Sequence, residues 1–312
     1  MPSFAADVKN ALSRTDVDRA CCQTAELAAL LRMGASVQTD GARGAGLRFT
    51  AASAAVARRV IRLLRAMDGA IETSVAMERM PQLRRRTYIV NIAAGAAVTP
   101  LLAQLGFAGG SLRSTSDLAL LRKKCCRAAY LRGAFLGGGS VNRPEAACHL
   151  EITARSEEMA RALHTLLRRL HFPVGLTDRH EMYVVYLKEG DAVMDFLSLI
   201  GAEEAAEEIE VARNLKEVRA QVNRLVNVET ANLQRAVDAA ADQLAAIERL
   251  ARSGRLAALP AALPEELRET AEMRRAHPEI SMAELAELCH ISKSGMSHRL
   301  RKLRMMAEEE TD

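Results

Sequence analysis

The chain carries one seventeen-residue pattern twice, and this duplication limits the folds it can adopt more than any other feature. Residues 21–37 read CCQTAELAALLRMGASV, and residues 125–141 read CCRAAYLRGAFLGGGSV. Aligned without a gap, the two segments agree at seven positions, including the CC pair and the GxSV ending. A second block repeats as well, with residues 87–106 matching residues 182–201. Two copies of one unit predict a body with pseudo-two-fold symmetry.

Both copies show the same order of hydrophobic patterns, alternating between helical and strand spacing. The expected order in each copy is helix, two strands, helix, two strands and helix. The predicted ranges are 16–33, 35–39, 46–50, 52–67, 70–76, 86–92 and 95–105 in the first copy, and 115–136, 140–142, 148–153, 156–170, 174–179, 182–187 and 191–199 in the second. Paired strands imply antiparallel sheets with helices over one face. The predicted class is α+β, with a duplicated α-β-β-α-β-β-α body.

The length of 312 residues leaves room for two or three domains. Pro260 and Pro264 indicate a linker before a final all-α domain. The expected domains are therefore a first repeat at 1–106, a second at 115–201, a helical connector at 203–258 and a C-terminal domain at 259–312.

No apolar run approaches the roughly 18 residues of a membrane span. The N-terminal segment resembles an amphipathic helix capped by Ser3 and not a signal peptide. We therefore expect a cytoplasmic protein.

The chain has six cysteines: Cys21, Cys22, Cys125, Cys126, Cys148 and Cys289. In a reducing compartment we expect free thiols, and the doubled CC pairs favour a structural role as small apolar side chains. Redox sensing and zinc binding are the alternatives. Zinc ligands are usually spaced C-x₂₋₄-C, since neighbouring residues on one helix point about 100° apart. The sequence therefore predicts no metal and no other cofactor.

The C-terminal segment has the spacing of a helix-turn-helix. Residues 281–288 predict a short helix, the chain breaks at Cys289 and His290, and Ser292 is a natural N-cap for a second helix. The small Ala286 allows the second helix to cross closely. The predicted core positions of the second helix are Met296, Leu300 and Leu303. We expect residues 265–276 to form the helix before this pair.

The second helix combines a polar tip with a run of cations. Short polar or basic side chains at its start are able to reach base edges in the major groove, namely Lys293, Ser294, Ser297 and His298. Cations further along are expected to contact phosphates and to add affinity without sequence information, namely Arg299, Arg301, Lys302 and Arg304. Residues 293–304 include no acid. The alternative is a solvated basic face on a protein-binding module.

The formal net charge is only +4, so the argument for a nucleic-acid partner depends on where the cations lie. Arginines and other basic residues gather near strand ends of the duplicated body. The candidates for phosphate contact are Arg84, Arg85, Arg86, Arg155 and Arg179, with Arg79, His180 and Lys188 nearby. Three asparagines at 223, 227 and 232 interrupt a helical segment, where Asn is a poor helix former. They indicate either a capped junction or a polar binding surface.

Residues 131–139, LRGAFLGGG, resemble a degenerate LAGLIDADG motif of the homing endonucleases. In that family two such helices pack at the two-fold axis, and an acidic residue near each helix end binds the divalent ion that activates water. The matching positions here are Gly34 and Gly138, and the other acidic position of the motif falls on Arg32 and Leu136. The resemblance thus implies the endonuclease scaffold without its metal ligands, and a sheet surface able to lie on DNA.

The order of motifs along the whole chain, from CC through RGAFLGGGSVN and VNRLVNVETANL to SKSGMSHRLRKL, resembles the WhiA family of bacterial regulators. This resemblance implies a degenerate endonuclease-like body followed by a helix-turn-helix domain. It also implies a transcription regulator acting in sporulation, cell division or chromosome segregation. The expected partner is double-stranded DNA, with a protein partner as a further role for the body, and the expected location is the nucleoid. The chain is not expected to be an enzyme.

Three other functions remain open on the sequence alone. An active metal-dependent endonuclease requires carboxylates at the motif ends, which this chain lacks. A scaffold of the nucleoid or the division machinery would bind DNA only secondarily, with a shallow salt dependence. A small-molecule effector site between the halves has no residue signature. Because duplication already supplies pseudo-symmetry, a monomer or weak dimer is expected.

Overall fold

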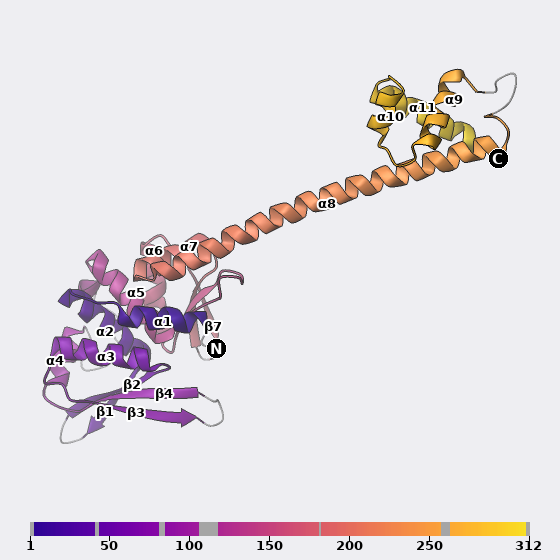
Figure 1. The fold of residues 1–312 in the computed structure, drawn as a ribbon. Coiled ribbons are helices and arrows are strands. Elements are labelled where there is room, and N and C mark those ends of the chain that lie inside the picture. Colours follow the sequence, from indigo (N-terminus) through magenta and orange to yellow (C-terminus); the bar gives the residue numbers. More distant parts are fainter. Residues whose placement is uncertain are drawn as a thin grey trace. The chain divides into compact units, whose positions relative to one another are not determined.

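The computed structural model describes residues 3–40, 44–80, 85–105, 118–180, 182–256 and 263–309 (Figure 1). Contacts divide the chain into two compact units, Met1–Lys216 and Glu217–Asp312, and each is described by itself. The dividing point lies inside a single helix, α8 (Glu203–Arg252). The domain ranges expected from the sequence remain predictions, and their limits at 106, 115, 258 and 259 lie outside the described residues.

The first repeat contains one antiparallel sheet with strand order β1-β2-β4-β3. Ser3 accepts a hydrogen bond from the Ala6 amide and caps the first helix, as predicted. The third strand begins later than the predicted residue 70, because the Asp68 carboxylate accepts a hydrogen bond from the Ala70 amide and holds a turn there. The elements are α1 (Phe4–Arg14), α2 (Ala20–Gly34), β1 (Ala35–Asp40), β2 (Gly44–Ala51), α3 (Ala54–Met67), β3 (Thr73–Met80), β4 (Arg85–Ile92) and α4 (Val98–Gln104).

The second repeat has the same order of elements and the equivalent sheet order, β5-β6-β8-β7, again antiparallel. Its elements are a 3₁₀ turn η3 (Leu118–Leu121), α5 (Lys124–Gly138), β5 (Gly139–Val141), β6 (Leu150–Ala154), α6 (Glu157–Arg169), β7 (Gly175–Arg179), β8 (Met182–Leu187) and α7 (Gly190–Ile200). The duplication and the α+β class are therefore confirmed.

The helix predicted over 115–136 was too long on its N-terminal side. Lys123 has an extended backbone (φ −82°, ψ 142°), and α5 begins only at Lys124. The Arg127 guanidinium donates hydrogen bonds to the carbonyls of Leu121 (2.8 Å) and Arg122 (3.1 Å), which holds the bend before the helix. As a result, the second CC pair lies in the first turn of α5 and not in the middle of a longer helix.

Helices α2 and α5 pack against each other through small residues. A Cβ on Gly133 would lie 2.3 Å from the Glu26 carbonyl oxygen, and one on Gly137 would lie 2.6 Å from the Met33 Cβ. Only glycine allows backbones to approach this closely. Most of α2 is buried, with Ala25 and residues 26–31 nearly inaccessible. A helix buried on nearly all sides is a core helix, and here it belongs to the core of both repeats.

One amphipathic helix covers each sheet, α3 in the first repeat and α6 in the second. Ser53 and Ser156 cap them by accepting hydrogen bonds from the amides of Val56 and Met159. The buried face of α3 includes Val56, Val60, Leu63 and Leu64, and that of α6 includes Met159, Leu163, Leu166 and Leu167. They pack with inward-facing strand residues, including Leu47, Phe49, Val90, Ile92, Leu150, Ile152, Val185 and Leu187.

The second unit consists of the C-terminal part of α8 and three shorter helices, α9 (Glu265–Ala276), α10 (Met282–Leu288) and α11 (Lys293–Glu308). Their shared core includes Ile247, Leu250, Leu267, Leu285, Met296, Leu300 and Leu303. Helices α9 and α10 match their predicted ranges within one residue, and α11 begins directly after the predicted N-cap Ser292. The charged segment after residue 203 is a single helix. Among the described residues, no helix is both long enough and apolar enough to cross a bilayer.

Candidate nucleic-acid interface

A capped, tightly closed turn joins α10 and α11. The Ser281 hydroxyl accepts a hydrogen bond from the Glu284 amide, and the Glu284 carboxylate accepts one from the Ser281 amide, so α10 begins with a capping box. His290 has a left-handed backbone (φ 53°). The Ile291 amide donates to the Ala286 carbonyl (2.9 Å) and the His290 amide donates to the Glu287 carbonyl (3.0 Å). This Schellman pattern ends α10 and directs the chain into α11.

The inner side of α11 sets the angle of the helix pair. The Ser292 hydroxyl accepts a hydrogen bond from the Gly295 amide (3.1 Å), so Ser292 is the N-cap as predicted. Met296, Leu300 and Leu303 are buried, together with Ala286 of α10. With these positions fixed in the core, the opposite side of α11 faces away from it.

The predicted base-reading residues lie together on that opposite side. Lys293, Ser294, Ser297 and His298 are all exposed and occupy the first turns of α11. The Arg301 guanidinium lies 3.4 Å from His298 Nδ1, one turn further along. Lys302 and Arg304 are exposed, and the Arg304 guanidinium pairs with Glu308 at 3.0 Å. The arrangement is a polar tip that continues into a cationic face.

Arg299 differs from the other cations of α11. Its side chain is 17% exposed, and its guanidinium lies 3.5 Å from the Glu266 carboxylate and 3.9 Å from that of Glu269, both on α9. Its sequence position, between the exposed His298 and the buried Leu300, gave no sign of this packing. We therefore assign Arg299 to the contact between α9 and α11, and its predicted role at phosphates is not part of the function proposed below.

A groove of about 480 Å³ runs along one side of α11 within the second unit. Ser297, Arg301 and Arg304 line it from α11, and Asp242 and Gln243 line it from the end of α8. Proximity to Glu308, and more weakly to Asp242, raises the pKa of Arg304. One carboxylate of α8 therefore lies beside the cationic face, so a bound phosphate would compete with Asp242 for the Arg304 guanidinium.

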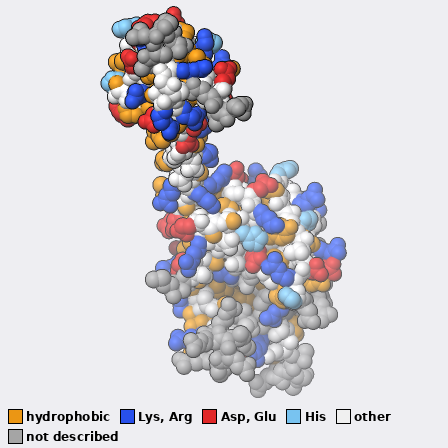
Figure 2. Space-filling view, turned by 90° about the vertical axis from the view of Figure 1, so that its right-hand side faces the viewer, with side chains coloured by type: hydrophobic (Ala, Val, Ile, Leu, Met, Phe, Trp, Pro, Cys, Tyr) orange, Lys and Arg blue, Asp and Glu red, His pale blue; other side chains and the backbone are white. Residues whose placement is uncertain are grey.

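The candidate cations on the duplicated body lie on a surface of mixed charge (Figure 2). Arg86, Arg155 and Arg179 are exposed, and Arg179 lies 4.0 Å from the Glu151 carboxylate. In the face drawn in Figure 2, Lys, Arg and His side chains of this unit are interspersed with Asp and Glu. Arg84 lies outside the described residues, and of Arg79 and Arg85 only the backbone is described, on β3 and β4. Phosphate contact by these residues stays a prediction.

The positions that match the endonuclease metal ligands have no room for a side chain. A Cβ on Gly138 would lie 2.3 Å from the Thr153 carbonyl oxygen and 2.4 Å from Met33 Cε. A Cβ on Gly34 would lie 2.7 Å from the Phe49 ring and 3.0 Å from the Thr50 carbonyl oxygen. The residues at these helix ends therefore do not fit a catalytic divalent ion, because both its carboxylate ligands and the space for them are missing.

Glu26 is the acidic residue of the helix pair, and it is already neutralised. Its carboxylate is fully buried and lies 2.6 Å from Arg59 Nε and 2.9 Å from Arg132 Nε. Arg59 comes from α3 of the first repeat and Arg132 from α5 of the second, and Arg132 also donates to the Ile200 carbonyl (3.1 Å). Two guanidiniums on one carboxylate leave no charge to bind a cation. Glu26 thus connects the repeats.

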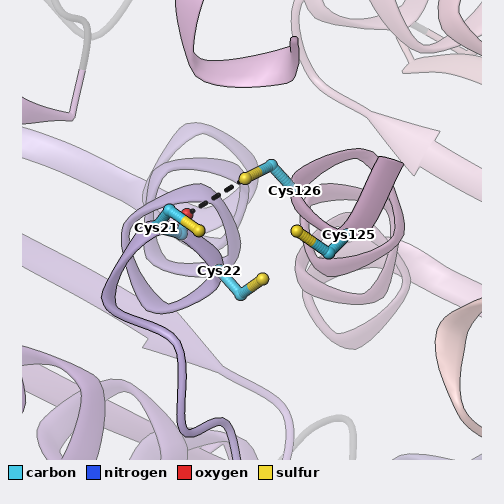
Figure 3. Close-up of side chains that lie close together, drawn as sticks. All are labelled: Cys21, Cys22, Cys125 and Cys126. Atoms are coloured by element: carbon cyan, nitrogen blue, oxygen red, sulfur yellow. Dashed lines mark hydrogen bonds between the residues drawn. The ribbon is translucent and has the colours of Figure 1, made fainter. Parts of the chain in front are cut away.

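A four-cysteine cluster, consisting of Cys21, Cys22, Cys125 and Cys126, lies at the other end of the same helix pair. All four sulfur atoms are within 4.8 Å of one another (Figure 3). Burial raises the pKa of the Cys22 thiol to about 12 and that of the Cys126 thiol to about 11. A hydrogen bond from Cys22 lowers the pKa of the Cys125 thiol to about 7, with Arg19 contributing. The spacing within each CC pair gave no sign that the two pairs meet, because the contact joins residues about 100 positions apart.

The fold and these sites define a class of protein: a duplicated LAGLIDADG-like body without metal ligands, followed by a helix-turn-helix domain. Family models match along nearly the whole chain. They are the WhiA N-terminal LAGLIDADG-like domain at residues 20–108, the WhiA LAGLIDADG-like domain at residues 127–219 and the WhiA C-terminal HTH domain at residues 222–307. The chain belongs to the WhiA family.

Full-length relatives support the same assignment. A probable cell division protein WhiA from Heliobacterium modesticaldum is 42% identical over 313 residues, covering 98% of this chain and 96% of the relative. The protein of the same name from Desulforamulus reducens is 43% identical with the same coverage. The crystal structure of full-length DUF199/WhiA from Thermatoga maritima has a TM-score of 0.62 at 23% identity, covering 99% of both chains, and so shares the fold.

Proposed function

We propose that this protein is a sequence-specific DNA-binding transcription regulator that reads its operator with α11 and has no nuclease activity. The observation that carries this proposal is the exposed polar tip of α11, which is held by a capped turn and continues into the exposed cations Arg301, Lys302 and Arg304. Membership of the WhiA family supports the proposal. The names of the relatives point to cell division as the process concerned, and we extend this to sporulation and chromosome segregation.

The residues of α11 divide into two roles. Lys293, Ser294, Ser297 and His298 read base edges, because they are exposed at the start of a helix that can enter the major groove. Arg301, Lys302 and Arg304 contact phosphates, which positions the helix and supplies affinity for any sequence. The body adds phosphate contacts through Arg86, Arg155 and Arg179.

The chemistry at the C-terminal ends of α2 and α5 supports the proposed absence of nuclease activity. Metal-dependent cleavage needs a cation that activates water and stabilises the leaving oxygen. The closed glycine positions at 34 and 138 offer no ligand, and the Glu26 carboxylate is occupied by Arg59 and Arg132. The body therefore serves as a binding scaffold. Incubation of bound supercoiled plasmid with Mg²⁺ or Mn²⁺ should give no nicked or linear product, and cleavage that a chelator abolishes would contradict this.

Selection from a random duplex library with the full chain provides the DNA for the main test. We expect the selected duplex to bind at least 10³-fold more tightly than a shuffled one. Lys293→Ala or Ser297→Ala should reduce this discrimination by about 1–3 kcal/mol. Arg301→Ala should weaken binding to both duplexes equally. It should also reduce the magnitude of the slope of log affinity against log salt by about 0.9.

A matched control lies in the same unit, on α9. Arg268 pairs with Glu265 of the same helix at 2.6 Å, and Arg268→Ala should leave both affinities unchanged. If the Lys293, Ser297 and Arg301 variants all lose as much affinity for the selected duplex as for the shuffled one, the division into two roles is refuted. Failure to enrich any sequence would refute the regulator and favour a scaffold whose DNA contact is secondary.

A further inference from the structure

The four-cysteine cluster lies outside every site used above, at the opposite ends of α2 and α5 from the closed glycine positions. We propose that these four cysteines bind one zinc ion as a tetrathiolate and so join the two repeats at their pseudo-two-fold axis. Each repeat supplies two ligands, from equivalent positions of the duplicated pattern. The site is structural and takes no part in DNA recognition by α11.

The sulfur positions suit a tetrahedral ion. With zinc–sulfur bonds of about 2.3 Å, the sulfurs of a regular tetrahedron are about 3.8 Å apart. In this protein all four are already within 4.8 Å of one another. The largest approach required is about 1 Å, which small rotations about χ1 can supply. In Figure 3 the four sulfurs surround a common point between the two helices.

Pairing of two helices removes the usual objection to adjacent cysteine ligands. Neighbouring residues on one helix diverge by about 100°, so one CC pair cannot supply a compact ligand set. When two helices face each other, however, the two sulfurs of each pair flank the space between them from opposite sides. Cys22 and Cys126 are buried, and Cys21 and Cys125 are half-buried. This alternation gives the cluster one open side, through which an ion can enter.

Positive groups beside the cluster can balance the charge of bound thiolates, which burial alone disfavours at Cys22 and Cys126. Both pairs lie in the first turn of a helix, at the second and third residues of α2 and α5, and neither helix has a side-chain N-cap. Free amides and the positive end of the helix dipole stabilise thiolates there. The Arg19 guanidinium lies beside Cys125. Arg122, Lys123 and Lys124, all exposed, directly precede the second pair. These cations balance the two negative charges of a zinc tetrathiolate.

The geometry fits a single ion better than a disulfide. A disulfide needs only two sulfurs, whereas here four are mutually close. The Cys126 thiol donates to the Cys21 carbonyl at 3.6 Å and so bridges the helices without a covalent bond. A tetrahedral set of four thiolates is typical of zinc or of iron. We assign zinc, because a closed set of four thiolates is a usual ligand set of structural zinc sites.

The test uses the full chain, expressed with added zinc and purified under reducing conditions without chelator. Elemental analysis should find one zinc per chain. Replacement of the ion by Co²⁺ should give the red-region absorption of a tetrahedral tetrathiolate, and excess Zn²⁺ should displace it. Removal of zinc should lower the melting temperature, since the ion binds only the folded state. Iron in place of zinc, or no metal with six reactive thiols, would overturn the proposal.

Variants separate binding from folding. Cys21→Ser with Cys125→Ser changes the two half-buried ligands and should abolish zinc binding and the Co²⁺ spectrum while circular dichroism stays native. Cys148→Ser with Cys289→Ser removes the two cysteines outside the cluster and should keep the full zinc content. Zinc retained by the first variant, or an interhelical disulfide found by mass spectrometry in freshly purified protein, would overturn the assignment.

Discussion

The two ends of the α2–α5 pair make an instructive comparison. At the C-terminal end, Gly34 and Gly138 press against neighbouring backbone and leave no room for a side chain. At the N-terminal end, the two cysteine pairs face each other with all four sulfur atoms within 4.8 Å of one another. The helices, their symmetry and their close packing are common to both ends. A fold thus determines where side chains can meet, and the residue at a few positions determines whether chemistry occurs there.

The largest predicted effect concerns Glu26, which lies between the two ends. Glu26→Ala should destabilise the protein by about 3–5 kcal/mol, because it leaves the buried Arg59 and Arg132 guanidiniums without their counter-charge. Urea denaturation of the full chain measures this change. The matched control, Glu157→Ala, removes the exposed partner of Arg161 and should cost at most about 1 kcal/mol. Equal effects would show that Glu26 does not join the repeats.

A smaller effect is expected at the closed end. Gly138→Ala should destabilise by about 1–3 kcal/mol, since its Cβ would overlap the Thr153 carbonyl and the Met33 side chain. Gly69→Ala is the control, because a Cβ there meets nothing within 4 Å. Thermal melts of both variants compare the sites. If Gly138→Ala is as stable as the control variant, the C-terminal end of the α2–α5 pair has space for a side chain. The two ends would then not differ in the way described above.

A third effect depends on pH and involves Lys9, whose ammonium lies 5.8 Å from the Phe135 ring centre in the last turn of α5. Burial lowers the pKa of Lys9 from 10.5 to about 8. Between these values the unfolded chain binds more protons at Lys9 than the folded chain does, so stability rises with pH there. Below pH 8 the penalty is constant.

Lys9→Met removes this penalty and keeps the side chain's length. The variant should melt a few degrees higher than the parent below pH 8, and the gain should shrink as pH approaches 10.5. Melting curves of both proteins across this range test the expectation. A gain independent of pH would mean that the variant improves packing only, and that Lys9 titrates normally.

Much of the fold could be predicted because local signals and the duplication agree. The strand at 182–187 and the helix at 265–276 match the structure residue for residue. The capped turn at Ser292 was also evident, since capping residues act within a few positions. The side chains of the predicted α11 tip, at residues 293, 294, 297 and 298, are exposed.

The features that the sequence did not predict share one physical cause, which is contact between residues far apart in the sequence. The four-cysteine cluster and the Glu26–Arg132 pair each join residues more than 100 positions apart. The Arg299 contact with Glu266 crosses 33 positions. Periodicity shows which face of a helix is apolar, but it does not show which charged or sulfur-bearing side chain the neighbouring element brings to that face.

The burial of α2 on nearly all sides has a consequence for synthesis on the ribosome. Glu26 and its partner Arg132 are separated by 106 residues. At about 5–20 residues per second, the ribosome needs roughly 5–20 s to make that stretch. Until α5 emerges, the apolar surface of α2 lacks its main partner. The nascent first repeat is therefore a natural client for chaperones, and its folding is completed by the arrival of the second.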